Sequence, residues 1–389
     1  MGGNRQPVIV GVADTPLEGG VVPGGTTPLR IQAQAAKAAL DSAGMTLNDI
    51  EGLLVAGSWG IPGPGQMMAM TVAEYLGIYP KLMDGTNIGG SSFDAFVCHA
   101  ALAIEQGYVD TAIILYGSTQ RSERSRTLGG RAPVLTTQYE TPFGMPTPVG
   151  AYAMAAHRHM HEYGTTSEQL AELAVATRKW AALNPSATMK DPLTVDDVLN
   201  STMIAEPLHL LDCCLVTDGG GAVVMTTAER AKDLKKPAIR VIGYGEAMTH
   251  ATIGSMPDLT LTAAAESGKR AFAMAGVKHE DIDVVEIYDS FTITVLLTLE
   301  SLGFCGRGEG GAFFEKQRTA PGGEFPLNTN GGGLSYAHPG MYGIFTIIES
   351  CQQLWGECGE RQVDNPKLAL AHGTGGVLSS TATLILAKD

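Results

Sequence analysis

Short runs of β-branched residues alternate along the chain with alanine-rich segments whose apolar positions recur every three or four residues. This alternation predicts strands over Val8–Val12, Ile50–Ala56 and Thr111–Tyr116. It predicts helices over Pro28–Ala43 and Ser92–Gln106. Strands joined by amphipathic helices are typical of an α/β fold.

The same order of elements returns in the second half of the chain. The Ala-Gly and Asp-Ile pairs of residues 43–50 recur in residues 275–282, in both cases 232 residues later (275 − 43 and 281 − 49). The Thr-Asn-x-Gly-Gly sequence of residues 86–90 likewise recurs at 329–333. A repeat of this length predicts a duplicated domain, with one helix-covered sheet in each half, and not a solenoid of short repeats.

The segment between the repeats resembles neither of them. It is rich in Gly, Pro, Thr and Arg up to residue 150, and helices are predicted afterwards over Ala151–Tyr163 and Glu168–Ala182. We therefore expect an N-terminal half formed by residues 1–120 plus 211–235, an inserted loop domain of residues 121–210, and a C-terminal half of residues 236–389.

Composition and charge exclude several classes of protein. The 389 residues carry a formal net charge of −14 and no run of five or more Lys or Arg, which argues against nucleic acid or an anionic membrane as a partner. No apolar run is long enough to span a bilayer, and the first residues lack the apolar core of a signal peptide. Six scattered cysteines without a CxxC pair predict reduced thiols, so we expect a cytoplasmic protein without a zinc ribbon.

Several common catalytic motifs are missing from the sequence. There is no P-loop and no Gly-x-Gly-x-x-Gly fingerprint after a strand, so nucleotide hydrolysis and hydride transfer have no support. The Gly-x-Ser-x-Gly elbow is also missing, because position 93 is Phe.

Five motifs together resemble the thiolase superfamily, in particular its sterol-carrier-protein-type branch. They cover nearly the whole chain and are specific only in combination. They are Thr86-Asn-Ile-Gly-Gly-Ser-Ser92, Leu211-Asp-Cys-Cys-Leu-Val-Thr-Asp-Gly-Gly220, Glu286-Ile-Tyr-Asp-Ser-Phe291, Gly333-Leu-Ser-Tyr-Ala-His-Pro-Gly340 and His372-Gly-Thr-Gly-Gly376. The resemblance implies a five-layered αβαβα fold, a homodimer, and chemistry on acyl-CoA thioesters at the junction of the two halves.

The chain departs from the thiolase pattern at the residues that carry the chemistry. The position of the family's nucleophilic Cys falls on Gly90, beside Ser91, and the motif histidine is replaced by Tyr288. The histidine of the family's Gly-His-Pro motif is retained as His338. Where many thiolases have a second Cys, this chain has His372, and none of these loops contains a cysteine thiol in its place.

These departures favour a reaction without a covalent acyl-enzyme. Retro-aldol cleavage of a β-hydroxyacyl-CoA needs a base for the hydroxyl proton and hydrogen-bond donors for the thioester enolate. Tyr288 and His338 are the candidates for proton transfer, and the backbone amides of Gly90 and Gly376 are candidate enolate donors. Replacing Cys by Gly is expected to make room for a branched hydroxylated carbon. Further candidates for contact with the substrate are Asp289, Tyr336, Tyr342 and His372.

Two other functions remain open at this point. An acyltransferase would need acylation of Ser91 or Ser92. The alternative interpretation of these two serines is structural, as N-cap residues of the following helix. A silent protein that binds acyl-CoA or lipid and supports a partner would need no nucleophile. The resemblance implies a coenzyme A thioester as substrate, no bound cofactor, and a small zinc-ribbon and OB-fold partner protein.

Two clusters of polar side chains have an ordinary and a functional interpretation. His157, His159 and His161 have spacing compatible with a metal site, but no matching ligands are evident, so a solvated helix and no metal is expected. Four arginines either bind the CoA phosphates or form a solvated stretch. They are Arg121, Arg124, Arg126 and Arg131.

Overall fold

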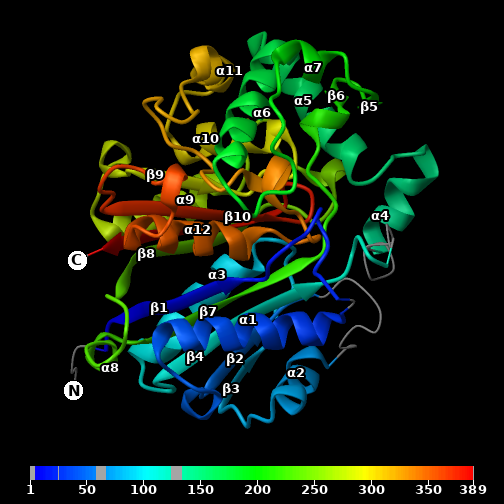
Figure 1. The fold of residues 1–389 in the computed structure, drawn as a ribbon. Helices are drawn as coiled ribbons and strands as arrows, with labels where there is room; N and C mark the ends of the chain where they lie inside the picture. The colour runs from blue at the N-terminus through cyan, green and yellow to red at the C-terminus, as the bar shows by residue number, and fades with distance from the viewer. Residues whose placement is uncertain (1–4, 25, 58–66, 124–133, 389) are drawn as a thin grey trace.

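The computed structural model describes residues 5–24, 26–57, 67–123 and 134–388. Its main sheet is built from strands of both halves of the chain (Figure 1). Along the sheet the strands are β3 (Leu82–Asp84), β2 (Gly52–Val55), β4 (Thr111–Ser118), β7 (Gly219–Thr227), β1 (Pro7–Asp14), β8 (Ile239–Met248), β11 (Ser380–Lys388), β10 (Leu368–Gly375) and β9 (Val284–Ile287).

The two halves have the same strand topology. In the N-terminal half β2 is parallel to β4, which pairs antiparallel with β7, which pairs antiparallel with β1. In the C-terminal half β9, β10, β11 and β8 repeat these directions in the same order. The predicted duplication is therefore confirmed in the fold.

The first strands of the two halves are joined, which the sequence did not predict. β1 and β8 pair through only two positions, Val8 with Arg240 and Ile9 with Ile239. The two expected sheets are consequently linked edge to edge. Away from this link they lie on opposite sides of the central helices (Figure 1).

Two helices fill the space between the half-sheets. α3 (Ser92–Glu105) and α12 (Gly343–Trp355) contact strands of both halves. Phe93, Phe96 and Ile344 in these helices are fully buried in one shared core. A helix covered on both sides needs apolar residues around most of its circumference, and both helices have them.

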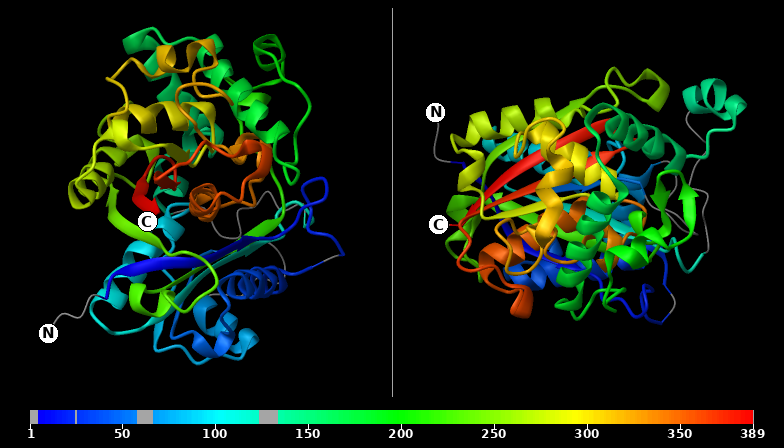
Figure 2. Two further views of the ribbon diagram at one scale, coloured as in Figure 1. Left: turned by 60° about the vertical axis from the view of Figure 1, so that its left-hand side comes forward. Right: turned by 90° about the horizontal axis from the view of Figure 1, so that it is seen from above.

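Outer helices cover the remaining faces and complete the five layers implied by the resemblance. α1 (Pro28–Ala43) and α2 (Met68–Leu76) cover the N-terminal half, and α9 (Ala264–Ala275) and α10 (Thr292–Leu302) cover the C-terminal half (Figures 1 and 2). α1 has the predicted bounds because Thr27 accepts a hydrogen bond from the amide of Arg30 and Gly44 ends the helix at φ 79°.

The inserted segment lies over the C-terminal half, at the top of Figure 1. Its elements are α4 (Val134–Tyr139), α5 (Val149–Tyr163), α6 (Ser167–Ala182), α7 (Val195–Leu199) and the small strands β5 (Met203–Ala205) and β6 (Leu208–His209). Two further short helices are α8 (Ala228–Ala231) and α11 (Gly310–Phe314). The domain boundaries given above remain a prediction.

A buried ion pair joins the inserted segment to the C-terminal half. Nε2 of His159 on α5 lies 3.1 Å from each carboxylate oxygen of Glu300 on α10, and its Nδ1 lies 2.8 Å from Oγ1 of Thr165. Both side chains of the pair are fully buried. The prediction of a solvated helix is therefore wrong for His159, whereas His157 and His161 are exposed.

Two further properties concern the described part of the chain. All six cysteines are free thiols, as predicted, and Cys98, Cys351 and Cys358 are buried. Within the described ranges, no helix is long and apolar enough to cross a membrane, and no three His, Cys, Asp or Glu side chains are grouped to hold a metal.

We predict that His159→Ala lowers the free energy of unfolding by about 3 kcal/mol, because it leaves Glu300 as an uncompensated buried carboxylate. Denaturant titration would measure this change. The exposed Lys37–Asp41 pair provides the control, since Lys37→Ala is expected to change stability by no more than about 0.5 kcal/mol. Equal effects of the two substitutions would show that the buried pair does not anchor the inserted segment.

Candidate active site

The candidate site lies where the end of β9 meets a loop that precedes α12. Tyr288 directly follows β9, and its amide donates to the backbone oxygen of His372 at 2.9 Å. His338 is held in its loop by Thr217, whose Oγ1 accepts from the His338 amide at 3.0 Å and whose amide donates to the His338 oxygen at 3.1 Å. Tyr288 Oη lies 2.7 Å from Nε2 of His338. The structure thus brings together the two residues predicted to transfer protons.

The ring of Tyr288 occupies the place of the missing nucleophile. A Cβ atom built on Gly90 would lie 1.9 Å from Cε1 of Tyr288 and 2.7 Å from the backbone oxygen of Thr374. No side chain at position 90 is compatible with the ring in this position. The expectation that glycine here makes room for a branched substrate carbon is therefore wrong, because Tyr288 fills that space.

Burial sets the protonation states of the pair. It raises the pKa of Tyr288 well above its usual value, and the neighbouring Cys214 adds to this shift. It lowers the pKa of His338 to about 4. At neutral pH the site therefore holds a phenol in hydrogen-bond contact with a neutral imidazole, an arrangement that can pass a proton in either direction.

The two serines that follow Gly90 have structural partners. Ser91 Oγ donates to the backbone oxygen of Ile88 at 3.1 Å and lies 2.9 Å from Oγ of Ser380. Ser92 Oγ accepts from the Ile88 amide at 2.9 Å. Both serines are fully buried, and neither hydroxyl contacts a base. Ser91 stands at the N-cap of α3 but makes no side-chain cap bond, so both hydroxyls fasten the preceding turn instead of capping the helix as predicted.

Asp289 holds the loop that carries His338. Its carboxylate accepts from the amides of Gly333 at 2.5 Å and Leu334 at 3.1 Å. Burial raises the pKa of Asp289 to about 7. With both oxygens facing backbone amides, this fully buried carboxylate fits a positioning role in place of the predicted contact with substrate.

Two other predicted contact residues, Tyr336 and Tyr342, lie around the pair with partners of their own. Tyr336 donates to the Asp14 carboxylate, and Tyr342 donates to Oδ1 of Asn330 at 2.7 Å. The Tyr342 ring centroid lies 5.6 Å from that of Tyr288, so Tyr342 supports the catalytic ring. Both hydroxyls are engaged away from the Tyr288–His338 contact.

His372 points to the wrong side of its strand to touch substrate. Gly373 faces Ser91 across the central layer, so the neighbouring His372 faces the outer helices because side chains alternate along a strand. Its Nδ1 lies 2.9 Å from Oγ1 of Thr383, and burial lowers its pKa to about 3. The prediction of substrate contact is contradicted, and its backbone oxygen contributes by holding Tyr288.

Gly376 lies against the turn that carries Gly90. A Cβ on Gly89 would lie 2.6 Å from the Gly376 amide nitrogen, so the two glycine-rich segments touch backbone to backbone. Gly376 itself has φ 63°, a conformation that favours glycine. Its backbone oxygen accepts from Oη of Tyr152 at 3.3 Å. The two segments that carry the predicted enolate donors therefore lie against each other, and the donor role stays a prediction.

Two residues near the pair were not singled out from the sequence. Tyr152 on α5 brings the inserted segment to the site, with its ring centroid 4.4 Å from that of Phe291. Cys214 is close enough to Tyr288 to add to the rise of its pKa. Burial raises the pKa of the Cys214 thiol well above its usual value, which disfavours a thiolate. Tyr152 carries no local sequence signal, whereas Cys214 belongs to a motif already noted.

Three of the four arginines of the predicted cluster, Arg124, Arg126 and Arg131, lie outside the described residues. Arg121 is exposed, and its Nη1 lies 2.9 Å from the place where a Cβ on Gly20 would be. Its role toward CoA phosphates stays a prediction.

The fold agrees with comparisons to known proteins. Residues 245–388 match the family described as Thiolase C-terminal domain-like. A protein of Thermomonospora curvata named steroid side-chain-cleaving aldolase is 33% identical over 94% of this chain and 94% of its own length. The chain belongs to the thiolase superfamily.

Other members of the superfamily resemble this chain to a similar degree. A protein of Methanothermobacter thermautotrophicus named acetyl-CoA acetyltransferase is 32% identical, over 91% of this chain and 93% of its own length. A solved structure described as "Ltp2-ChsH2(DUF35) aldolase" is 32% identical, with a TM-score of 0.87, over 99% of this chain and 98% of that chain. This thiolase-superfamily chain is thus similar both to proteins named aldolases and to one named an acyltransferase.

We predict that Gly90→Ala lowers the free energy of unfolding by about 1–3 kcal/mol, because its Cβ overlaps the Tyr288 ring. Gly85→Ala in the same loop is the control, since a Cβ there meets nothing within 4 Å. Denaturant titration would compare the two. In a Tyr288→Ala background the cost of Gly90→Ala should fall but not vanish, because the overlap with the backbone oxygen of Thr374 at 2.7 Å remains, and an unchanged cost would contradict the contact with the ring.

Proposed function

We propose that this chain cleaves the carbon–carbon bond of a β-hydroxyacyl-CoA by a retro-aldol reaction. The observation that carries the proposal is the Tyr288–His338 contact of 2.7 Å at the place where a thiolase nucleophile would stand. Similarity to proteins named as a steroid side-chain-cleaving aldolase and an Ltp2-ChsH2 aldolase supports it. A coenzyme A thioester is the substrate, and the residues present require no covalent acyl carrier.

In the first step the β-hydroxyl of the substrate gives its proton to the oxygen of Tyr288. The phenol proton of Tyr288 passes at the same time to Nε2 of His338. The electron pair of the O–H bond forms the new C=O bond, the Cα–Cβ bond breaks, and its electrons move to the thioester carbonyl as an enolate. A ketone or aldehyde is the first product.

In the second step the enolate is protonated at its α-carbon. The proton returns from His338 through Tyr288, which restores the phenol and the neutral imidazole. In this proposal the amides of Gly90 and Gly376 stabilise the enolate oxygen, which the close approach of the segments that carry them supports. The second product is an acyl-CoA shortened by the carbons of the released carbonyl compound.

Acyl transfer is the alternative function, supported by similarity to a protein named acetyl-CoA acetyltransferase. It would require an acylated residue. Ser91 and Ser92 are buried and bonded within their own turn, and burial disfavours the thiolate of Cys214. These placements favour the aldol reaction over acyl transfer.

We predict that the chain releases a shorter acyl-CoA and a carbonyl compound from β-hydroxyacyl-CoA substrates without consuming free CoA. Tyr288→Phe should lower kcat by at least about 100-fold, because the relay loses its proton, with little change in acyl-CoA binding. Mass spectrometry of products from β-hydroxy and β-keto panels, including steroid-type acyl chains, would measure both effects.

The same assay separates the alternatives. Cleavage of β-keto substrates that depends on added CoA would overturn the aldolase assignment in favour of acyl transfer. Binding of acyl-CoA without turnover of any substrate, in the presence and absence of copurified proteins, would favour a binding scaffold.

We further propose a cytoplasmic homodimer that also binds a small zinc-ribbon and OB-fold partner of the DUF35 type. The partner is suggested by the description of the similar aldolase structure. The dimer is supported by β3, the outermost strand at this end of the sheet among the described residues, and by the adjacent α2, because this region carries exposed apolar side chains. They are Met70 and Tyr75 on α2, Tyr79 between α2 and β3, and Met83 on β3, of which Tyr79 is 96% exposed.

Negative charge introduced at the β3 edge should prevent dimer formation. We predict that the chain sediments as a dimer and that a Tyr79→Glu, Met83→Glu double variant sediments as a monomer, because the new charges oppose burial. Met274→Glu, at a comparably exposed methionine on α9, is the control and should leave the dimer intact. A monomeric parent protein, or a dimer in the double variant, would contradict this interface.

A further inference from the structure

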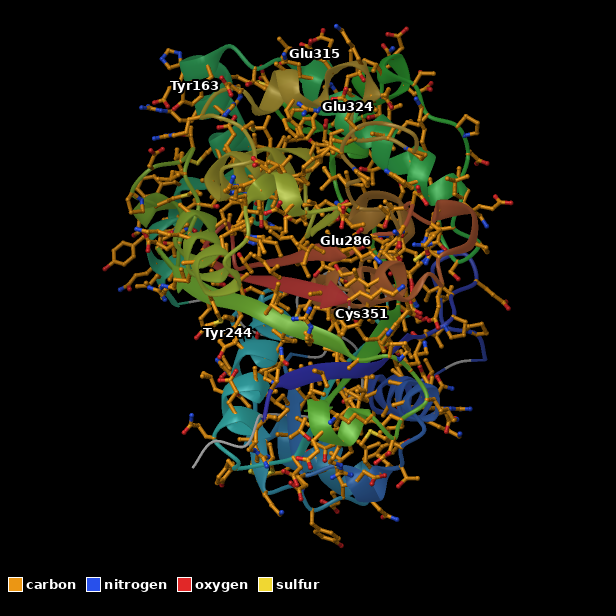
Figure 3. The ribbon with its side chains drawn as sticks, turned by 90° about the vertical axis from the view of Figure 1, so that its left-hand side faces the viewer. Tyr163, Tyr244, Glu286, Glu315, Glu324 and Cys351 are labelled. Atoms are coloured by element: carbon orange, nitrogen blue, oxygen red, sulfur yellow. The ribbon has the colours of Figure 1, made fainter. Side chains whose placement is uncertain are left out.

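A single hydroxyl group lies between two buried carboxyl groups beneath the candidate site. Oγ1 of Thr329 lies 2.8 Å from Oε1 of Glu286 on β9 and 2.7 Å from Oε1 of Glu349 on α12. The side-chain amide of Gln353 donates to the same Oγ1 at 2.9 Å. Glu286 is fully buried, inside the upper half of the molecule in Figure 3.

The donors and acceptors around this hydroxyl can be counted. The orientation of the Gln353 amide is fixed, because its Oε1 accepts from the Val363 amide at 2.9 Å and from Nε2 of Gln362 at 3.0 Å. Gln353 can therefore only donate, and its two amide protons have three acceptors within reach: Oγ1 of Thr329 at 2.9 Å, the backbone oxygen of Arg361 at 3.0 Å and Oε1 of Glu349 at 3.2 Å. Whichever acceptors it uses, Thr329 has only one proton for two carboxyl oxygens. One of those oxygens must carry a proton of its own.

The second carboxyl group is the ionised one. Arg361 donates to both oxygens of Glu349, each at 3.0 Å, which is the paired geometry of an arginine with a carboxylate. Among the described residues, Glu286 makes no ion pair with a cation, and its Oε2 has no hydrogen-bond partner. Its Oε1 accepts from the Thr329 amide at 2.9 Å. The proton therefore belongs on Glu286.

We infer that Glu286 is a protonated carboxylic acid that donates to Oγ1 of Thr329 and acts as a positioning residue for Tyr288. Thr329 in turn donates its own proton to Glu349. This arrangement satisfies Gln353, Thr329 and Glu349 at once, whereas an ionised Glu286 would leave two carboxylates competing for one hydroxyl proton.

The turn of residues 328–330, which carries Thr329, connects the segments that carry Tyr288 and His338. Ile287 donates to Oδ1 of Asn328 at 2.8 Å, so the turn is fastened to β9 directly before Tyr288. Asn330 Oδ1 accepts from the hydroxyl of Tyr342, the ring that packs on Tyr288. The turn then leads into the loop that carries His338. The role of Glu286 in turnover rests on the proposed function, whereas its protonation does not.

Other titratable groups face this carboxyl group and bear on its pH dependence. Burial is the main cause that raises the pKa of Glu286; Glu349 from α12 adds to this direction, and so does Asp289, two residues beyond the end of β9. Tyr342 and Cys358 also feel its charge. Arg361 is directed to Glu349, so no positive charge offsets an ionised Glu286.

Infrared difference spectroscopy of the full chain tests the protonation without any substrate. The wild type minus Glu286→Gln spectrum should contain one C=O band in the carboxylic-acid region, where carboxylates do not absorb. Glu300→Gln is the control, since Glu300 is a buried carboxylate paired with His159, and its difference spectrum should lack that band. A Glu286→Gln difference that contains only carboxylate bands would overturn the inference.

A second variant keeps the test valid if Glu286→Gln does not fold. Thr329→Val removes the acceptor of the Glu286 proton, so it should shift the carboxylic-acid band to the position of a free acid without removing it. A spectrum unchanged by this substitution would contradict the hydrogen bond.

The positioning role is tested by turnover against pH. The wild type should lose activity at alkaline pH as Glu286 loses its proton, in addition to any effect of Asp289. Glu286→Gln, which cannot ionise, should lack that part of the decline and keep a lower plateau of activity. Identical pH profiles would overturn the positioning role, and absence of turnover in all proteins with the predicted infrared band would instead contradict the proposed function alone.

Discussion

The contact between the Tyr288 ring and the backbone of Gly90 determines what this active site can do. A Cβ at position 90 would lie 1.9 Å from the ring, so the aromatic side chain and a nucleophilic side chain are mutually exclusive there. The ring needs its own support, which Tyr342 and the backbone oxygen of His372 provide. The tyrosine and the glycine are therefore two parts of one change, from covalent acyl chemistry to proton relay.

In both halves the threonine of the repeated Thr-Asn-x-Gly-Gly sequence hydrogen-bonds a carboxyl group, which comes from the same segment in the first half and from β9 in the second. In the N-terminal half, the amide and hydroxyl of Thr86 donate to Oδ1 of Asp84 at 2.9 and 2.7 Å, and His99 beside it helps lower the pKa of that carboxyl to about 2. In the C-terminal half, Thr329 meets Glu286 in a similar geometry, but the second carboxyl beside it is Glu349. The neighbour of each carboxyl group thus determines whether it is ionised.

Patterns within short segments predicted the structural features that depend on residues close together in the sequence. The helix over Pro28–Ala43 was placed correctly because its cap, apolar face and terminal glycine lie within one segment. The duplication could also be predicted from the sequence, because the second half repeats such segments. Tyr288 and His338 were found because each stands in a motif that could be compared with a family pattern.

The remaining features depend on packing between distant segments. The side-chain direction of His372 follows from strand register, and the burial of His159 follows from its contact with α10. The sequence predicted open space beside Gly90. This prediction failed because Tyr288, whose ring fills the space, lies 198 residues further along the chain (288 − 90). The inferred proton on Glu286 depends on hydrogen bonds among four side chains from three separate segments of the chain.

Intact-protein mass spectrometry during turnover tests the central claim most directly. If Tyr288 has replaced the nucleophile, the chain keeps its unmodified mass at every time point while β-hydroxyacyl-CoA is consumed. A species heavier by one acyl group, formed and lost at the rate of turnover, would contradict the account.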